Sequence, residues 1–587
     1  MFFFNATRTA LGAVFRRSMI AAAVFFVGAC TQKTNEEPSG EPAAAPRPVL
    51  ADTIFTAATI YTADPAKPTA QAVAVKEGII IAVGSKADMA AFTGPTTASV
   101  SAGTGTLYPG FTDAHAHLIG IGLREMTLNL EGTPSIAALK ETVARKVAAL
   151  APGAALYGRG WIETGWPEGR FPNRFDLDAV APDNPVILER ADGHAMVVNS
   201  ATLTRANITA ETPDPDGGRI DKDENGQPTG LLIDRASDLV SSLISQPDDA
   251  QRRKAYRVGA DVYAAYGWTG LHNMSVPPRD IDLMEQLASE PHSETNGSAL
   301  PIRVYNSIDA YGLDTLLTTG ARSDESGRII TRAIKVYADG ALGSRGAALF
   351  DPYADQPETK GLVLIDSEDA VSLYKKALDA GLQVNTHAIG DRGNRLVIDW
   401  FSKAVAGSEI VPEGARFRIE HAQIVRPQDI SDIKRLGLIA SMQPSHAIGD
   451  LFFAPDRLGT ERLNGAYAWQ SMIEAGVIVA GGSDAPVERG DPRIEFYAAV
   501  ARRGLDGTQT DDWHAEEAVT RENALKMFTL WPAYASFQED QLGTITVGKR
   551  ADFTAFSADI MTIPAEEILT VETVLTVVDG AVIFPPN

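Results

Sequence analysis

Cysteine, runs of basic residues and long apolar stretches are all scarce in this sequence. Its 587 residues include one cysteine, Cys30, so the chain forms no internal disulfide bond. Lys and Arg number 52 against 75 Asp and Glu, which gives a formal net charge of −23 at pH 7 and would repel nucleic acid. The sequence has no G-x-S-x-G, G-x-G-x-x-G or Walker motif, which argues against a serine hydrolase and against a nucleotide-binding enzyme.

The first thirty residues combine positive charge with a short apolar segment. Three arginines and no acidic residue accompany the apolar stretch 19–27, which is shorter than the roughly 20 residues of a membrane-spanning helix and favours an export signal. The end of the segment, "VGAC", resembles the lipobox of bacterial lipoproteins, in which the cysteine is lipidated and becomes the mature N-terminus. We therefore expect residues 1–29 to be a signal peptide. A lipid on Cys30 would anchor the exported protein to a bacterial membrane, with the outer membrane favoured, on its periplasmic side or at the cell surface. A buried, unmodified Cys30 is the alternative.

Strand-like segments occur at both ends of the chain. Residues 30–52 are rich in Pro, Ala, Glu and Ser and are expected to form a disordered tether. Short β-branched runs broken by Gly, Asp and Pro then fill 53–108, and similar runs fill 541–587. We predict a small β-sandwich domain assembled from these two segments.

Between these ends, residues 109–540 alternate short apolar strands with longer helical patterns. About eight such strands can be counted, which is the number that closes a (β/α)₈ TIM barrel. The region of about 155–234 is longer than a strand-to-helix connection needs and contains the hairpin punctuation "DGGRIDKDENGQPTGLL". We expect it to be an inserted, lid-like element. Its Trp161 is a candidate wall of a substrate pocket, with core packing as the alternative.

Two histidines one residue apart, in "GFTDAHAHL", mark the first candidate site. Alternate residues of a strand share a face, so His115 and His117 point the same way, and at the carboxyl end of a barrel strand that face looks into the active-site mouth. An H-x-H pair alone is weak evidence for a metal. Four later predicted strands, however, also end on a possible metal ligand, and these are Lys335, His387, His421 and Asp484.

These motifs, in this order, resemble those of the metal-dependent amidohydrolase superfamily. The resemblance covers nearly all of the chain from about Ile54 to its end, including "LGTITVGKRADF" in the C-terminal segment. Within the superfamily, the stretches "KVYADGALGSRGAAL", "THAIGDR", "RIEHAQ" and "GSDAPV" are similar to those of the branch that includes N-substituted formamide deformylases.

The resemblance implies a binuclear metal centre. One divalent metal is then bound by His115, His117 and Asp484, and the second is bound by His387 and His421. We expect two zinc ions per chain, although imidazole and oxygen ligands also suit iron, manganese and cobalt.

The resemblance further implies that Lys335 bridges both metals as its N-carboxylated form. A free ammonium group is a poor ligand beside two cations, whereas a carbamate offers two anionic oxygens. A one-metal site beside an unmodified Lys335 is the alternative that the sequence leaves open.

The implied activity is hydrolysis of a carbon–nitrogen bond, other than a peptide bond, in a small formamide-like amide. Metal binding lowers the pKa of water from 15.7 to about 7, so metal-bound hydroxide would attack the carbonyl. Asp484 would accept the proton and pass it to the leaving amine. A lactone or ester hydrolase, a deaminase and a catalytically silent surface-binding lipoprotein are the alternatives. Oligomeric state is not indicated.

Several further residues are weaker candidates. His194 in "DGHAMVVNS" is expected to be catalytic by holding the substrate carbonyl oxygen, with a structural hydrogen bond as the alternative. His446 in "MQPSHAIGD" and Arg345 in "ADGALGSR" are candidate substrate-binding residues. The alternative for Arg345 is that, with Asp339, it positions Lys335 or the loop around it. The remaining candidates are assigned structural or solvent-exposed roles, and these are His272, His292 and His514.

Overall fold

The computed structural model describes residues 49–585, apart from 164–165, 192, 194, 216–217, 245, 292–297, 408–411 and 511–512. The expected signal peptide, Cys30 and most of the expected tether, as well as His194 and His292, therefore lie outside the described residues. Within the described ranges, no helix is long and apolar enough to cross a membrane.

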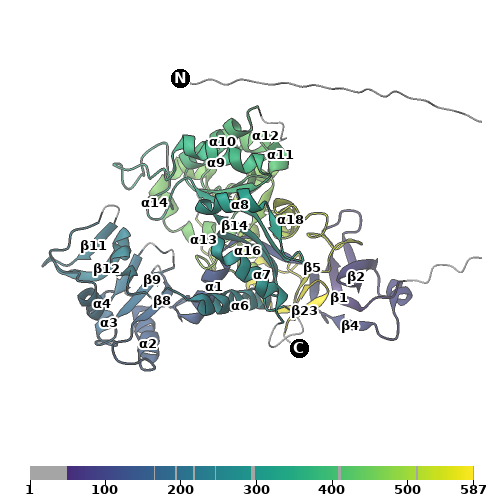
Figure 1. Ribbon diagram of the computed structural model, residues 1–587, viewed down its shortest axis with the longest axis horizontal. Helices are drawn as coiled ribbons and strands as arrows, with labels where there is room; N and C mark the ends of the chain where they lie inside the picture. The colour runs from purple at the N-terminus through teal and green to yellow at the C-terminus, as the bar shows by residue number, and fades with distance from the viewer. Residues whose placement is uncertain are drawn as a thin grey trace, which may run out of the picture. The chain divides into compact units, whose positions relative to one another are not determined.

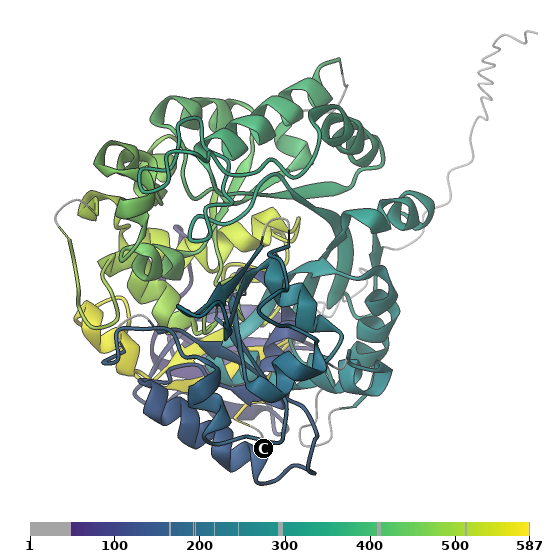
Figure 2. The ribbon, with the colours of Figure 1, turned by 90° about the vertical axis from the view of Figure 1, so that its left-hand side faces the viewer.

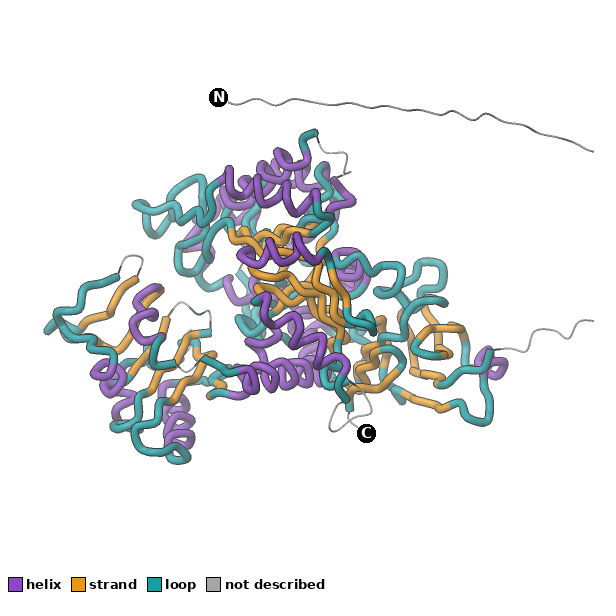
Figure 3. Tube along the Cα trace, viewed as in Figure 1, coloured by secondary structure: helices purple, strands orange, loops and turns teal. Residues whose placement is uncertain are grey.

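Eight parallel strands form the central barrel (Figures 1 and 3). They pair in chain order, and the short antiparallel strand β15 (Arg322–Ser323) lies beside one of them. The eight strands are β6 (Phe111–Ala116), β13 (Trp268–Val276), β14 (Arg303–Asp309), β16 (Ile329–Tyr337), β17 (Gln383–Ala388), β18 (Arg418–His421), β19 (Ile439–Met442) and β20 (Val479–Gly481). The residues just after β20 connect back to β6, where the Asp484 amide donates to the His115 carbonyl at 2.7 Å and the Ser483 amide donates to Asp113 at 2.9 Å. The predicted parallel barrel is thus confirmed.

Helices follow the strands and lie outside the barrel (Figure 2). The longest of the described helices is α6 (Asp249–Tyr266). It shows why such a segment is helical, because Asp248 and Gln251 form a reciprocal capping box and Gly267 ends the helix in the left-handed region at φ 107°. The other helices of the barrel region are α1 (Leu118–Met126), α7 (Ile281–Ser289), α8 (Leu313–Thr319), α9 (Ser367–Asp379), α10 (Asp391–Val405), α11 (Pro412–Ala415), α12 (Pro427–Arg435), α13 (Pro444–Asp450), α14 (Ala454–Leu458), α15 (Trp469–Glu474), α16 (Pro492–Ala501), α17 (Arg521–Met527) and α18 (Leu530–Ala535).

Both ends of the described chain contribute to one eight-stranded sheet. Its strands run in the order β23-β22-β21-β5-β1-β2-β3, and β4 pairs with β1. Their bounds are β1 (Thr53–Tyr61), β2 (Thr69–Lys76), β3 (Ile79–Gly84), β4 (Ala98–Ser101), β5 (Thr106–Pro109), β21 (Phe553–Phe556), β22 (Thr573–Val578) and β23 (Ala581–Phe584). The N-terminal and C-terminal parts meet where β5 pairs with β21, and the buried rings of Phe55 and Phe553 pack edge to face at 5.2 Å.

An ion-pair network joins this terminal sheet to the barrel. Arg303 opens β14, and its guanidinium donates to Asp552 and to Asp579, which lie just before β21 and just after β22. Arg328 and Arg550 also bind Asp579. Burial acts to raise the pKa of Asp579, but these guanidinium groups outweigh it and lower that pKa to about 2.

We expect Asp579→Asn to destabilise the protein by about 2 kcal/mol at pH 7, because a pKa lowered from 3.8 to about 2 represents that much differential stabilisation of the charged form. A lowered folded-state pKa stabilises the protein above the unfolded-state value, and this contribution disappears as the pH falls from about 4 towards 2. The thermal midpoint of the variant should therefore lie below that of the wild type at pH 7 and converge on it below pH 4. Asp238→Asn, at a side chain that is 72% exposed, is the control. A difference in thermal midpoint between variant and wild type that does not change with pH would contradict the prediction.

A second sheet is inserted between β6 and β13. Its six strands run in the order β11-β12-β10-β9-β8-β7, with bounds β7 (Leu128–Asn129), β8 (Leu156–Trp161), β9 (Val186–Arg190), β10 (Ala195–Val198), β11 (Gly218–Lys222) and β12 (Pro228–Asp234). Its helices are α2 (Ile136–Val147), α3 (Arg174–Asp178), α4 (Ser200–Arg205) and α5 (Asp238–Ser241). The predicted hairpin is confirmed, since β11 and β12 pair antiparallel around the turn at Asp223–Gln227. The sheet begins near residue 128, earlier than the predicted boundary.

Trp161 lies in the core of this inserted sheet. Its side chain is fully buried, packs near Trp166, and donates its indole N–H to the Leu188 carbonyl at 2.8 Å. No surface of the ring is left to contact a substrate, so the prediction of a pocket wall at Trp161 is wrong and the core-packing alternative holds.

Candidate metal centre

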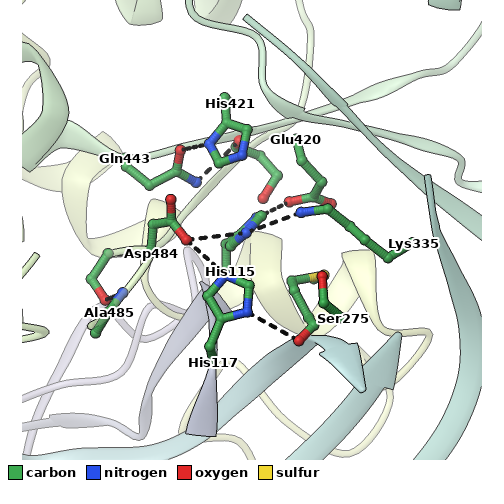
Figure 4. Close-up of polar contacts among 12 residues, drawn as sticks. His115, His117, Ser275, Lys335, Glu420, His421, Gln443, Asp484 and Ala485 are labelled. Atoms are coloured by element: carbon green, nitrogen blue, oxygen red, sulfur yellow. Dashed lines mark hydrogen bonds and ion pairs between the residues drawn. The ribbon is translucent and has the colours of Figure 1, made fainter. Parts of the chain in front are cut away.

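The carboxyl end of β6 presents two imidazoles to the barrel mouth. His115 is fully buried and donates from Nδ1 to the Glu420 carboxylate at 2.6 Å, while His117 donates from Nδ1 to the Met274 carbonyl at 3.1 Å. Both Nε2 atoms then face the same carboxylate oxygen of Asp484, at 3.4 Å from His115 and 3.0 Å from His117 (Figure 4). The pair therefore converges on one point, as the strand alternation predicts.

Three further predicted ligands surround this point. The Lys335 Nζ atom lies 3.3 Å from His115 Nε2. The His421 ring lies 4.7 Å from the ring of His115 and 4.6 Å from that of His387, measured between centroids. His421 donates from Nδ1 to Gln443 at 2.8 Å (Figure 4), so in this tautomer the lone pair is on Nε2. All six residues predicted as ligands are thus gathered in one connected cluster.

His387 sits at the edge of the cluster, next to a buried aspartate. Its Nε2 lies 3.4 Å from the Gly340 carbonyl and 3.6 Å from Asp339. The Asp339 carboxylate accepts the backbone N–H groups of Ala348, Ile389 and Gly390, so it fixes the loops that follow β16 and β17. Burial raises the pKa of Asp339 to about 7.

The electrostatics of the cluster favour neutral imidazoles beside an ionised carboxylate. Burial, helped by the Lys335 charge, lowers the pKa of His387 to about 3 and that of His115 well below its usual value. Burial lowers the pKa of His421 in the same direction, and so does the repulsion that would arise if His387 and His421 were both protonated. Burial acts to raise the pKa of Asp484, but the neighbouring histidines outweigh it and hold that pKa well below its usual range. These are the protonation states in which imidazole and carboxylate bind metal.

The donor set fits a divalent metal ion. One ligand atom from each of His115, His421 and Asp484 lies within 4.8 Å of the others, and these three residues are buried. Hydrogen bonds on the Nδ1 atoms of His115 and His421 select the tautomer whose Nε2 lone pair is available, which is how metal-binding histidines are usually oriented. His115 comes from the predicted ligand pair His115 and His117, and His421 comes from the pair His387 and His421. The two predicted pairs therefore meet at the same place in the barrel mouth.

Two residues that hold these imidazoles were not predicted from the sequence. Glu420 directly precedes His421 on β18, and neighbouring strand residues normally face opposite sides of a sheet. His421, however, has a backbone φ of 74°, in the left-handed region that side chains other than glycine rarely adopt, and this lets both residues reach the site. Gln443 follows β19 and holds His421. A buried acid next to a histidine in "RIEHAQ" was the available signal for Glu420.

The weaker candidates separate into two groups. His446, on α13, places Nε2 3.7 Å from Asp484, stacks at 5.9 Å on the His421 ring, and has no hydrogen-bond partner on Nε2 among the described residues. It therefore belongs to the site. Arg345 instead binds Asp355 at 2.7 Å, a carboxylate that it shares with Arg457, so its predicted substrate contact is not supported.

Of the two described histidines with no expected site role, His272 fits its structural assignment, whereas His514 was expected to be solvent-exposed and is half-buried. His272 is buried and accepts a hydrogen bond from Arg418 at 2.7 Å. His514 pairs with the exposed Glu516 at 2.8 Å. The candidate catalytic His194 lies outside the described residues.

A parallel barrel whose strands end in imidazoles, a carboxylate and a buried lysine defines the class of metal-dependent barrel hydrolases. The model of the amidohydrolase family matches residues 98–584, and the chain belongs to this family. It is accordingly a hydrolase that acts on carbon–nitrogen bonds.

Individual relatives agree with this assignment. YtcJ of Bacillus subtilis is 32% identical over 528 residues, covering 89% of this chain and 98% of its own. The N-substituted formamide deformylase of Arthrobacter pascens is 28% identical over 550 residues, covering 90% and 98%. Among solved structures, an uncharacterized metal-dependent hydrolase from Pyrococcus horikoshii superposes with a TM-score of 0.70 at 25% identity, over 87% of this chain and 99% of its own.

Proposed function

We propose that the protein hydrolyses a non-peptide carbon–nitrogen bond in a small, formamide-like amide, using two zinc ions bridged by carboxylated Lys335. The observation that carries the proposal is the convergence of His115, His117, His421 and Asp484, with the imidazole Nδ1 atoms held and the Nε2 atoms directed inward. The similarity to a protein named as an N-substituted formamide deformylase supports the choice of substrate class.

The ligands divide as the strand ends suggest. His115, His117 and Asp484 would hold one ion, and His387 and His421 the other. When bound, a divalent ion supplies a Lewis acid that lowers the pKa of water and polarises a carbonyl oxygen. The protein contributes the orientation of its ligands. Glu420 and Gln443 keep two of the imidazoles in the binding tautomer, and such supporting groups typically contribute 10-fold to 100-fold in metal affinity.

Lys335 is suited to carboxylation. It is buried on β16, and burial lowers the pKa of its amine to about 8, so far more of it is neutral near pH 7 than of an ordinary lysine. The neutral amine is the nucleophile that adds to CO₂. A bond forms between Nζ and the carbon, and one proton leaves the nitrogen to give the carbamate anion. The carbamate replaces a buried positive charge by a negative one among the proposed metal ligands.

Asp484 is positioned to move the proton in this proposal. One of its oxygens faces His115 and His117, and the other faces His446 at 3.7 Å. Its ionised carboxylate can accept a proton from the attacking water and deliver it to the amine nitrogen, which must be protonated to leave.

Export and anchoring belong to the same proposal and rest on the sequence of the first thirty residues. The lipid on Cys30 would hold the enzyme at a bacterial membrane, and residues 30–52 would act as its tether. The β-sandwich assignment of the terminal sheet and the lid role of the inserted sheet are likewise proposed. Protection from hydrogen exchange in β11 and β12 that increases when an amide binds would support the lid, and unchanged protection would argue against it.

Metal removal tests the proposed activity. We expect elemental analysis of the purified protein to find about two zinc ions per chain, with chelation abolishing hydrolysis of a panel of N-formyl and N-acyl amines. Added zinc with bicarbonate should restore both metal content and turnover. One ion per chain would point to an unmodified Lys335. Hydrolysis of lactones instead of amides would favour the esterase alternative, and no metal with no turnover would favour a silent binding protein.

A further inference from the structure

Two hydroxyl groups form a bridge across the carboxyl ends of β13 and β16. Ser275 lies near the end of β13, Tyr337 is the last residue of β16, and their hydroxyl oxygens are hydrogen-bonded to each other. In the barrel, β14 lies between these two strands, so the bridge spans the end of β14. The Tyr337 residue is 40% exposed, which places it at the open mouth and not in the packed interior.

The bridge lies beside residues of the candidate ligand cluster at both of its ends. Tyr337 lies two residues after Lys335, on the same face of β16, and the Lys335 Nζ atom is 5.1 Å from the centre of its ring. The His387 ring lies 5.4 Å from the Tyr337 ring. At the other end, the backbone carbonyl of Met274, next to Ser275 in the chain, accepts the Nδ1 hydrogen bond of His117. The hydroxyl pair therefore links both halves of the predicted ligand set.

Two features show that the bridge is more than a surface contact. Ser275 has a backbone φ of 55°, in the left-handed region that is strained for a residue other than glycine and is concentrated at functional sites. The two hydroxyl groups also carry one proton each, and the hydrogen bond between them needs only one of these protons. Among the described residues neither hydroxyl has another hydrogen-bond partner, so one proton remains available to a ligand.

We propose that Tyr337, positioned by Ser275, donates a hydrogen bond from its hydroxyl group to the carbonyl oxygen of the scissile bond. Ser275 donates to the Tyr337 oxygen, and the Tyr337 hydroxyl donates to the substrate, so the hydrogen bond strengthens as negative charge develops on that oxygen. The proposal rests on the proposed function, since it names the group that contacts the reacting carbonyl at the same site. Donors aimed at such an oxygen typically contribute about 10²-fold to 10³-fold to kcat.

The test compares Tyr337→Phe, Ser275→Ala and the double variant on the metal-loaded protein. We expect Tyr337→Phe to lower kcat about 100-fold with little change in KM, and Ser275→Ala to lower it about 10-fold. The double variant should match Tyr337→Phe alone, because Ser275 acts through the tyrosine. Metal content should be unchanged in all three. Tyr311→Phe, at a tyrosine that is 74% exposed and follows β14, is the matched control and should retain wild-type kcat.

Binding of an N-alkyl methylphosphonamidate, a tetrahedral mimic of the reacting amide, provides a readout without turnover. Calorimetry should show about 100-fold weaker binding to Tyr337→Phe than to the wild type, and unchanged binding to Tyr311→Phe. If the wild type hydrolyses amides but Tyr337→Phe keeps full kcat and full affinity for the probe, the role of Tyr337 is wrong and the proposed function stands. Parallel loss of metal would also overturn the inference, because the tyrosine would then be structural. A wild type that neither turns over amides nor binds the probe would overturn both proposals.

Discussion

Asp484→Asn is expected to retain most of its bound metal and to lose about 10²-fold to 10⁴-fold of kcat, the range usually contributed by a positioned acid–base group. The amide keeps a carbonyl oxygen that can still approach His115 and His117, which the aspartate oxygen reaches at 3.4 Å and 3.0 Å. It cannot accept and return a proton. Metal content and kcat measured on the same preparation separate these two functions.

A matched control removes a charge of the same sign at an exposed position. Asp506→Asn changes an exposed carboxylate that caps Thr508, and it should leave both kcat and metal content unchanged. Wild-type turnover in Asp484→Asn would remove Asp484 from proton transfer. Loss of all metal in that variant would instead show that its main contribution is ligation.

The sequence was sufficient to predict the barrel and the gathering of the candidate ligand side chains, because both follow local rules. Each ligand ends a short apolar strand, and the carboxyl ends of parallel strands meet on one face of a barrel. His115, Lys335 and Asp484 could therefore be placed together although they are far apart in the chain. The hairpin of β11 and β12 could also be predicted from a short segment, because the residues of its turn favour that conformation.

The remaining features depend on packing that local patterns do not encode. The alternation of side chains along a strand would turn Glu420 away from the site that His421 faces, and only the positive φ of His421 brings both inward. Trp161 was ambiguous because an aromatic residue in a glycine-rich stretch can line a pocket or fill a core, and the six-stranded sheet decides for the core. The Ser275 and Tyr337 pair joins two strands that are not neighbours, which no single segment could reveal.

Arg418→Met is expected to lower the free energy of unfolding by about 3–5 kcal/mol, because it leaves a buried charge without its partner. Arg418 and Glu420 are both fully buried within the barrel, and their side chains approach to 2.7 Å. The same guanidinium donates to His272 at 2.7 Å and to Ser441 at 2.8 Å. Its loss should lower the thermal midpoint measured by calorimetry. Arg435→Met, at a side chain that is 60% exposed, should lower the free energy of unfolding by about 1 kcal/mol or less.

The double variant Arg418→Met, Glu420→Gln tests whether the loss of stability in Arg418→Met arises from the unpaired Glu420 carboxylate or from lost packing. If the cost arises from the unpaired carboxylate, neutralising it should recover much of the lost stability, and the two substitutions should be strongly non-additive. The double variant should nevertheless bind metal more weakly than the wild type, because Glu420 also holds the Nδ1 atom of His115 at 2.6 Å. Additive losses of stability would contradict this account. Recovery of stability without recovery of metal affinity would show that the buried pair serves the orientation of His115 more than the stability of the barrel.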